Sequence, residues 1–168
     1  MRGTTLRQSI LNILDRLEPK KIIVASSSPQ IRYPDSYGLD MEKFDHFVAF
    51  FAALDLLKDK GMENVIHDTY KQCLEEVKKE DGEIKNCTRA LYAPLTAAEI
   101  SAKIVELLKP ADLKADLEII FQSMDGLHQA CPAHPGDWYF SGKYPTAGGN
   151  KMANAAYIEY YESKIMKK

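Results

Sequence analysis

Ile22-Ile23-Val24-Ala25 is the stretch that decides the fold. A short unbroken apolar run rich in β-branched residues is typical of a strand buried on both faces of a parallel sheet. Ahead of it, Thr4 and Thr5 can cap a helix that Pro19 ends. A second strand-like run follows at residues 117–122. A helix that feeds such a strand predicts an α/β fold. The apolar positions of that first helix recur at helical spacing and are Leu6, Ile10, Ile13, Leu14 and Leu17.

The rest of the chain is dominated by helical periodicity. Gly61 is a stop signal between two helical stretches. Thr96 followed by Glu99 is a capping box, which predicts a helix start. Asn150 is expected to cap the last helix. The expected helices span residues 44–57, 64–79, 96–108, 125–130 and 150–163.

Length and composition bound the class of protein. A chain of 168 residues with 45% hydrophobic content can bury one core, so one domain is expected. The 22 Lys and Arg residues nearly balance the 24 Asp and Glu residues, which leaves no basic excess for nucleic acid. No apolar run is long enough to span a bilayer, and the 3 widely spaced cysteines do not form a disulfide framework. We therefore expect a cytoplasmic protein that binds neither nucleic acid nor membrane.

Arg2-Gly3-Thr4-Thr5 lies where the first helix starts. Unpaired N–H groups, the positive end of the helix dipole and two hydroxyls would make this a cradle for phosphate. On spacing alone, a capped helix without a ligand is the commoner explanation. The loop from Ser26 to Asp40 follows the first strand, and ligands of open α/β sheets bind at that end of a strand.

Two parts of the sequence resemble the glutamine phosphoribosylpyrophosphate amidotransferases, or amidophosphoribosyltransferases. One is Arg2-Gly3-Thr4-Thr5 together with the thirteen residues from Ser28 to Asp40, and the other is Gly142-Lys143-Tyr144-Pro145-Thr146. The resemblance covers residues 1 to about 50 and 114–150. It implies the C-terminal part of a type I phosphoribosyltransferase domain, with a Rossmann-like parallel sheet. Residues from about 50 to 113 would be a mostly helical insertion.

The resemblance also implies roles for particular residues. The 5′-phosphate would be held by Arg2, Gly3, Thr4 and Thr5. The active site, near the path that carries ammonia, would be lined by Ser28, Pro29, Arg32, Tyr37 and Asp40. An alternative is that Arg32 and Asp40 only tie the loop together by a charge pair.

The activity implied by the resemblance is the first step of de novo purine biosynthesis. It forms 5-phosphoribosylamine from phosphoribosylpyrophosphate and glutamine, with magnesium on the pyrophosphate. The acidic pair that precedes the Arg-Gly-Thr-Thr motif in the family, and the glutaminase domain with its N-terminal cysteine, are not in this chain, which opens at Met1. We expect the isolated chain to be inactive and the intact enzyme to be a homo-oligomer that binds phosphoribosylpyrophosphate or purine nucleotides.

Two other classes of function stay open. The chain could be a non-catalytic module that binds a phosphate group or a nucleotide at the helix start. It could also be an interaction piece whose exposed strand edge pairs with a partner. Weak nucleotide affinity without turnover would favour the first, and self-association would favour the second.

Metal sites are not expected. Some members of the family carry a four-iron cluster, but the matching positions here are Asp35, Gly136 and Tyr139, which cannot replace three thiolates. His128, Cys131 and His134 stand at intervals of three. The prolines between and after them break any helix that would align the three side chains.

Overall fold

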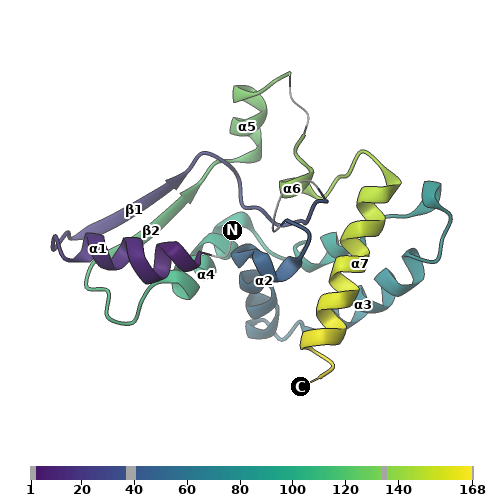
Figure 1. Cartoon of the computed structure of the whole chain (residues 1–168), viewed down its shortest axis with the longest axis horizontal. Helices are drawn as coiled ribbons and strands as arrows, with labels where there is room; N and C mark the ends of the chain where they lie inside the picture. Colours follow the sequence, from purple (N-terminus) through teal and green to yellow (C-terminus); the bar gives the residue numbers. More distant parts are fainter. Residues whose placement is uncertain (1–2, 37–40, 134–135, 168) are drawn as a thin grey trace.

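The computed structural model describes residues 3–36, 41–133 and 136–167, and it is a mixed α/β fold that is mostly helical (Figure 1). Within these residues, no helix is long and apolar enough to cross a membrane. In chain order the elements are η1 (Leu6–Ile10), α1 (Leu11–Asp15), β1 (Lys21–Ser26), η2 (Phe44–His46), α2 (Val48–Asp59), α3 (Glu63–Glu76), η3 (Asp81–Glu83), η4 (Cys87–Leu91), α4 (Ala97–Leu108), β2 (Asp116–Phe121), α5 (Met124–Ala130), α6 (Trp138–Ser141) and α7 (Ala147–Lys164).

β1 and β2 form a two-stranded parallel sheet, as the sequence predicts. Lys21 pairs with Asp116 at one end and Ser26 with Phe121 at the other. The prediction that the first strand is buried on both faces was wrong. Ile22 is buried, whereas its neighbour Ile23 is 56% exposed. The reason is that the first helix and α4 pack on one face of the sheet, while the residues on the other face, such as Ile23, stay open to solvent.

The first helix runs over residues 4–15, and its first part, η1, is a π-helical turn. The helix was predicted, but its buried face was not. Leu11 is fully buried, whereas Ile10 and Ile13 are 44% and 57% exposed. The N–H of Leu11 bonds to the carbonyl of Leu6, and this π spacing adds one residue to the turn. Leu6, Leu11 and Leu14 therefore face the sheet in place of the α-helical series.

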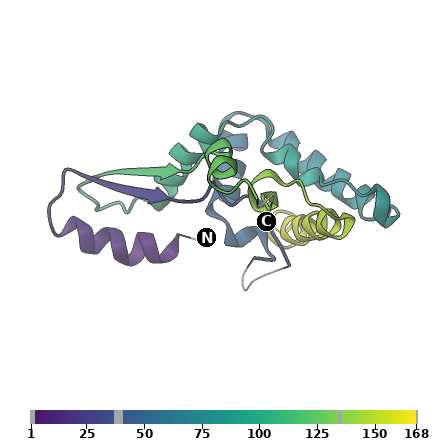
Figure 2. The same cartoon turned by 90° about the horizontal axis from the view of Figure 1, so that it is seen from above.

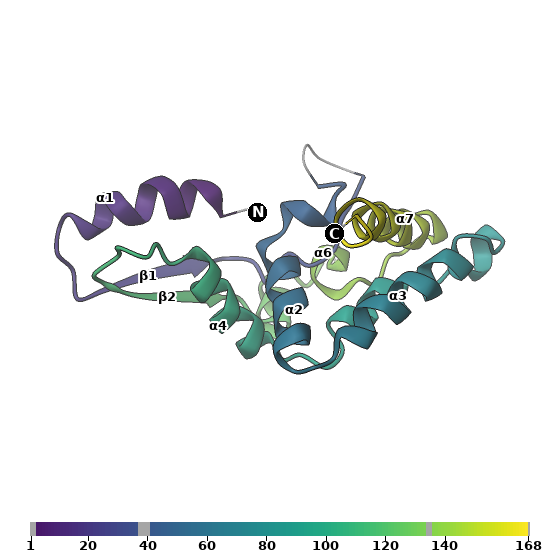
Figure 3. The same cartoon turned by 90° about the horizontal axis from the view of Figure 1, so that it is seen from below.

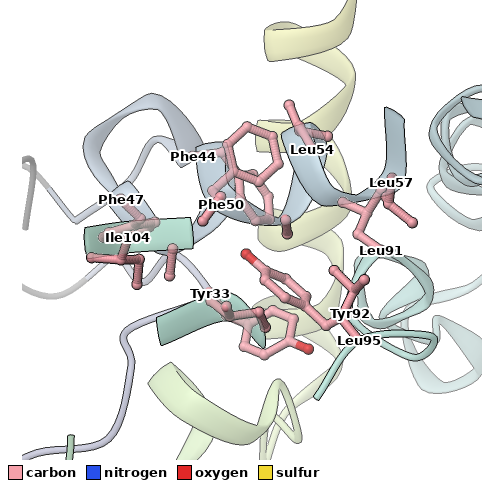
Figure 4. Packing of buried hydrophobic residues seen from close by; sticks show 14 of the residues in the cluster. Tyr33, Phe44, Phe47, Phe50, Leu54, Leu57, Leu91, Tyr92, Leu95 and Ile104 are labelled. Atoms are coloured by element: carbon pink, nitrogen blue, oxygen red, sulfur yellow. The ribbon is translucent and has the colours of Figure 1, made fainter. Parts of the chain in front are cut away.

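The helical part of the molecule holds the main core, and Figures 2 and 3 show it beside the sheet and the first helix. Its centre is aromatic. Figure 4 shows Phe44 beside Phe50, and the centres of their rings are 4.7 Å apart. The ring of Tyr160 on α7 also lies 4.7 Å from that of Phe50. The same cluster reaches Ile119 on β2. Residues 50–113 therefore share a core with the sheet, and their status as an insertion stays a prediction.

The helix ends follow local signals, with one correction. The capping box of Thr96 and Glu99 is complete at the start of α4, as predicted. Gly61 ends α2 with a φ of +67°, which suits glycine. The prediction that Asn150 caps the last helix was wrong. Thr146 caps it, and Asn150 lies one turn inside, where its side chain donates to the carbonyl of Ile84.

Candidate functional site at the carboxyl ends of the strands

The start of the first helix and the carboxyl ends of both strands lie at the same end of the α/β part (Figures 1 and 3). A narrow, largely apolar hollow joins them. It is lined by Leu6 of the first helix, by Ser26 and Phe121 at the strand ends, and by Ser28 of the following loop. The two segments predicted to bind a ligand, the helix start and the loop, are therefore neighbours. This is the end of a parallel sheet at which ligands bind.

Glycine is required at the helix start. Gly3 has a φ of +73°, and its carbonyl accepts a hydrogen bond from the N–H of Arg7 at 2.9 Å. A Cβ at Gly3 would lie 2.3 Å from a methyl carbon of Leu108 on α4. Both the backbone conformation and the close approach of α4 exclude a larger residue.

The two threonines do not cap the helix, which corrects the prediction. Thr5 is already in helical conformation and makes no capping hydrogen bond through its side chain. The side chains of Thr4 and Thr5 are exposed, and Thr4 lines a hollow of about 250 Å³ together with Gly3 and Arg7. Their hydroxyls are therefore accessible to a ligand. Arg2 lies outside the described residues.

The loop after β1 is built around a buried amide. The side chain of Gln30 is 4% exposed, and its Nε2 donates to the carbonyl of Ala97 at 2.8 Å and to Oγ of Ser101 at 2.7 Å. Its Oε1 accepts hydrogen bonds from Nε and Nη2 of Arg32 at 3.2 and 2.7 Å. Two N–H groups of the Arg32 guanidinium thus share the Gln30 side-chain oxygen as acceptor. The Gln30 side-chain nitrogen is in turn held by α4.

Tyr92 makes two further contacts with Arg32. The guanidinium carbon lies 5.5 Å from the centre of the Tyr92 ring, within the range of a cation–π contact. The Tyr92 hydroxyl donates to the backbone carbonyl of Arg32 at 2.8 Å. Sequence reasoning missed Gln30, Tyr92 and Ser101. Gln30 sits within the recognised motif, but nothing local marks Tyr92 or Ser101, because they are 60 or more residues away from Arg32 in sequence.

Ser28 and Pro29 have local structural roles. Oγ of Ser26 donates to the carbonyl of Ser28 at 3.0 Å, which closes the turn at the end of β1. Pro29 is buried beside Gln30. Tyr37 and Asp40, the other two predicted residues of this loop, lie outside the described residues, and so does any charge pair between Arg32 and Asp40.

The two segments that carry the family resemblance touch each other. The N–H groups of Arg32 and Tyr33 both donate to the carbonyl of Tyr139, at 2.9 and 3.0 Å. Gly142, with a φ of +68°, lies against the Tyr33 ring, which a Cβ would approach to 2.7 Å. The Tyr144 hydroxyl donates to the carbonyl of Pro34. The C-terminal segment therefore supports the loop directly.

Asp35, Gly136 and Tyr139, which match the iron–sulfur cysteines of other family members, lie where the C-terminal segment meets the loop. Nε1 of Trp138 donates to Oδ2 of Asp35 at 2.7 Å, and the backbone of Tyr139 anchors the loop as described above. Gly136 lies close to the Trp138 ring. None of the three supplies a thiolate, so the absence of an iron–sulfur cluster stays a prediction. The iron content of protein purified without air tests it, and stoichiometric iron would refute it.

The spacing of His128, Cys131 and His134 also suggested a metal site. Nε2 of His128 lies 3.0 Å from Oδ2 of Asp137, and Cys131 is exposed. His134 lies outside the described residues. Across the described ranges, no group of three or more His, Cys, Asp or Glu side chains could hold a metal ion.

Tyr33, which belongs to the loop, and Tyr92, which packs against it, are buried packing groups. Burial raises the pKa of the Tyr33 hydroxyl to about 12, and it raises the pKa of Tyr92 well above its ordinary value. Both hydroxyls are therefore neutral at physiological pH. Their rings pack edge to face with centres 5.1 Å apart, and neither hydroxyl is suited to carry a proton at that pH.

Comparison with known proteins gives a partial match. Over about half of its length, the chain is similar to amidophosphoribosyltransferases. It is 34% identical to that of Haemophilus influenzae over 86 residues, 29% identical to that of Escherichia coli over 86 residues, and 32% identical to that of Pasteurella multocida over 87 residues. The matched segment is 51% of this chain and 17% of each relative. No protein-family model and no solved structure matches the chain.

Proposed function

We propose that this chain provides the 5′-phosphate-binding end of an amidophosphoribosyltransferase, within a type I phosphoribosyltransferase fold. Such an enzyme forms 5-phosphoribosylamine from phosphoribosylpyrophosphate and glutamine at the start of purine biosynthesis. The observation that carries the proposal is the open helix start at Gly3, Thr4 and Thr5, which lies at the carboxyl ends of two parallel strands. The partial similarity to amidophosphoribosyltransferases supports the same reading.

The helix start suits a phosphate group for three reasons. The first N–H groups of the helix have no intrahelical partner, and the helix dipole is positive there. The hydroxyls of Thr4 and Thr5 are exposed and are not used for capping. Arg7 adds a cation to the same hollow, and none of the described residues that line it is acidic. A phosphate dianion would meet donors and positive potential there.

The role of this end of the protein would be positioning. A phosphate held at the helix start fixes one end of the sugar, which restricts where the reacting carbon can lie. Arg32 and the loop from Ser28, held by Tyr139 and Tyr92, would line the neighbouring part of the site. Magnesium would enter on the pyrophosphate of the substrate. Among the described residues, no group of three or more His, Cys, Asp or Glu side chains could hold the ion.

Calorimetry with ribose 5-phosphate tests the proposal. The chain is titrated as the wild type and as the Thr4→Ala, Thr5→Ala double variant. Loss of two hydroxyl donors to a charged group should weaken binding about tenfold or more. The helix should persist, because alanine is a better helix former than threonine. Unchanged affinity in the double variant, or no binding by the wild type, would exclude the helix start as a phosphate site.

The matched control is Ser9→Ala on the same helix. Ser9 is exposed and does not line the hollow, so this change removes a hydroxyl from the same helix at a different place. Its affinity for ribose 5-phosphate should equal that of the wild type. Equal losses in the control and in the double variant would point to a general effect on the helix.

A non-catalytic phosphate-binding module is the second candidate function. The hollow at the helix start favours this function, because none of the described residues that line it carries a carboxylate that could hold the ribose hydroxyls. Pyrophosphate release from phosphoribosylpyrophosphate, magnesium and ammonium separates the two. We expect binding without release for this chain alone. Release well above that of the Thr4→Ala, Thr5→Ala variant would show that the chain is itself catalytic.

A further inference from the structure

We propose a second anion site in this protein, in a hollow of about 350 Å³ beside Arg32 at the carboxyl ends of the strands. It would take the phosphate or carboxylate group of a small molecule that has an apolar body. The hollow lies between the loop after β1, the start of α4 and the segment that follows β2. Its lining residues are Pro29, Gln30, Arg32, Ala97, Ala98, Ser101, Phe121, Gln122, Ser123, Met124 and Phe140.

Arg32 is held ready for an anion. Two of its N–H groups donate to Oε1 of Gln30, and its guanidinium carbon lies 5.5 Å from the centre of the Tyr92 ring. Gln30 is itself held by α4. An arginine has five N–H donors, so further donors of this guanidinium remain for a ligand. Because its rotamers are already restricted, little conformational entropy is lost when an anion binds.

Two serines add hydroxyl donors. Oγ of Ser101 accepts a hydrogen bond from Gln30 at 2.7 Å, and Oγ of Ser123 accepts one from the N–H of Gly126 at 2.9 Å. In each case the oxygen is used as an acceptor, so the hydroxyl proton can be donated to a ligand. Both side chains line the hollow from different elements, α4 and the turn after β2. An anion between them would receive donors from two sides.

The hollow beside Arg32 carries positive charge. Arg32 is its cation, and no acidic side chain is found among the described residues that line it. A guanidinium in a partly enclosed hollow attracts an anion more strongly than it would on an open surface. The electrostatics therefore select a negatively charged group.

The walls select the rest of the ligand. The lining includes the apolar residues Phe121, Met124, Phe140, Pro29 and two alanines of α4. A volume of about 350 Å³ lies within the range of small-molecule pockets. A bare phosphate would leave this apolar surface uncovered, whereas an aromatic phosphate would bury it. The structure thus favours phenyl phosphate over inorganic phosphate as a probe.

This hollow is distinct from the one at the helix start. The residues that line the two hollows do not overlap. The titrations can therefore be done in the Thr4→Ala, Thr5→Ala background, in which binding at the helix start is expected to be about tenfold weaker or more. If ribose 5-phosphate fails to bind at the helix start, the expected binding of phenyl phosphate beside Arg32 is unchanged. If phenyl phosphate fails to bind, the proposal for the helix start is likewise unchanged.

The test is calorimetry with phenyl phosphate and with inorganic phosphate in that background. Phenyl phosphate should bind saturably, and more tightly than inorganic phosphate. Arg32→Gln should weaken it about 10- to 100-fold, because a charge-assisted hydrogen bond is lost. Arg16→Gln is the matched control, since Arg16 is exposed at the far end of the first helix and lines neither hollow. It should bind as its parent does.

Two further variants keep the test decisive if Arg32→Gln does not fold, which circular dichroism would reveal. Arg32→Lys keeps the charge but loses the planar fork, and Ser101→Ala removes one donor. Each should weaken phenyl phosphate binding measurably. The proposal is overturned if phenyl phosphate shows no saturable binding at millimolar concentration, or if folded variants at Arg32 and Ser101 bind it as tightly as their parent.

Discussion

The sheet with its first helix and the helical part of the molecule are built from the same kinds of residue, but they differ in how much they bury. The small core under the first helix consists of Leu11, Ile22, Leu113 and Ala115. The main core includes three fully buried phenylalanines and a fully buried tyrosine, namely Phe44, Phe47, Phe50 and Tyr157. Among the described residues, five of the seven exposed large apolar side chains belong to the smaller part, and they are Ile10, Ile13, Leu17, Ile23 and Ile120.

The difference shows where the α/β part gets its stability. Its open face exposes apolar side chains, and neither outer strand edge has a strand partner in the residues described here. What anchors it is β2, because Ile119 belongs to the main core together with Ile104 and Leu108 of α4. The candidate sites lie at this junction, where the weakly covered sheet meets the well-packed helices.

The largest expected effect separates the two cores. Phe50→Ala should lower the free energy of unfolding by about 3–5 kcal/mol, because it leaves a cavity beside Phe44 and Tyr160. Leu11→Ala should cost less, about 2–3 kcal/mol, since the smaller core can collapse towards solvent. Urea unfolding of both variants measures this. Equal costs would mean that the two cores are equally well packed.

Hydrogen exchange sharpens the same comparison. In Leu11→Ala the amides of β1 should lose protection while those of α2 and α7 keep it, because local opening of the small core does not require the main core to open. In Phe50→Ala protection should fall in both parts. A uniform loss in Leu11→Ala would show that the molecule opens as one unit.

Through its tyrosines, alkaline pH should act on the main core, since none of the 9 tyrosines lies in the first helix, in β1 or in β2. Burial raises the pKa of Tyr33 from 10.0 to about 12, so folding favours its neutral form. Its contribution is complete below about pH 10 and is lost as the pH rises towards 12, by about 3 kcal/mol. The pKa values of Tyr92 and Tyr157 are raised by burial too, which adds to the loss.

Denaturant unfolding at several pH values between 9 and 12 measures this, with Tyr33→Phe as the comparison. Phenylalanine cannot ionise, so the variant should lose less stability across the range. If wild type and variant have the same pH profile, Tyr33 is not buried as the structure has it.

Local signals in the sequence predicted much of this fold, and the misses have physical causes. Periodicity located the helices, and the β-branched runs located both strands. The buried face of the first helix was missed because a π turn shifts the register by one residue after Leu6, which hydrophobic spacing does not encode. The sequence predicted Arg32 as a site residue, but not Gln30, Tyr92 and Ser101 around it. Their contacts join distant segments, and only the tertiary structure brings them together.

The smallest expected effect on stability comes from a comparison of two helix starts, Thr96 at α4 and Thr5 at the first helix. Thr96 caps α4 by accepting a hydrogen bond from the N–H of Glu99 at 3.2 Å, while Oε2 of Glu99 accepts one from the N–H of Thr96 at 2.8 Å. Thr96→Ala should therefore lower the free energy of unfolding by about 1 kcal/mol. Thr5 makes no such bond, so Thr5→Ala should change it by at most a few tenths of a kcal/mol.

Urea unfolding under identical conditions compares the two variants with the wild type. If Thr5→Ala costs as much as Thr96→Ala, Thr5 does cap its helix, and its hydroxyl is not available to a phosphate. If Thr5→Ala leaves stability unchanged while ribose 5-phosphate binding falls in the Thr4→Ala, Thr5→Ala variant, the hydroxyls serve the ligand and not the fold. A polar side chain that neither stabilises the helix nor packs in the core is then explained by binding.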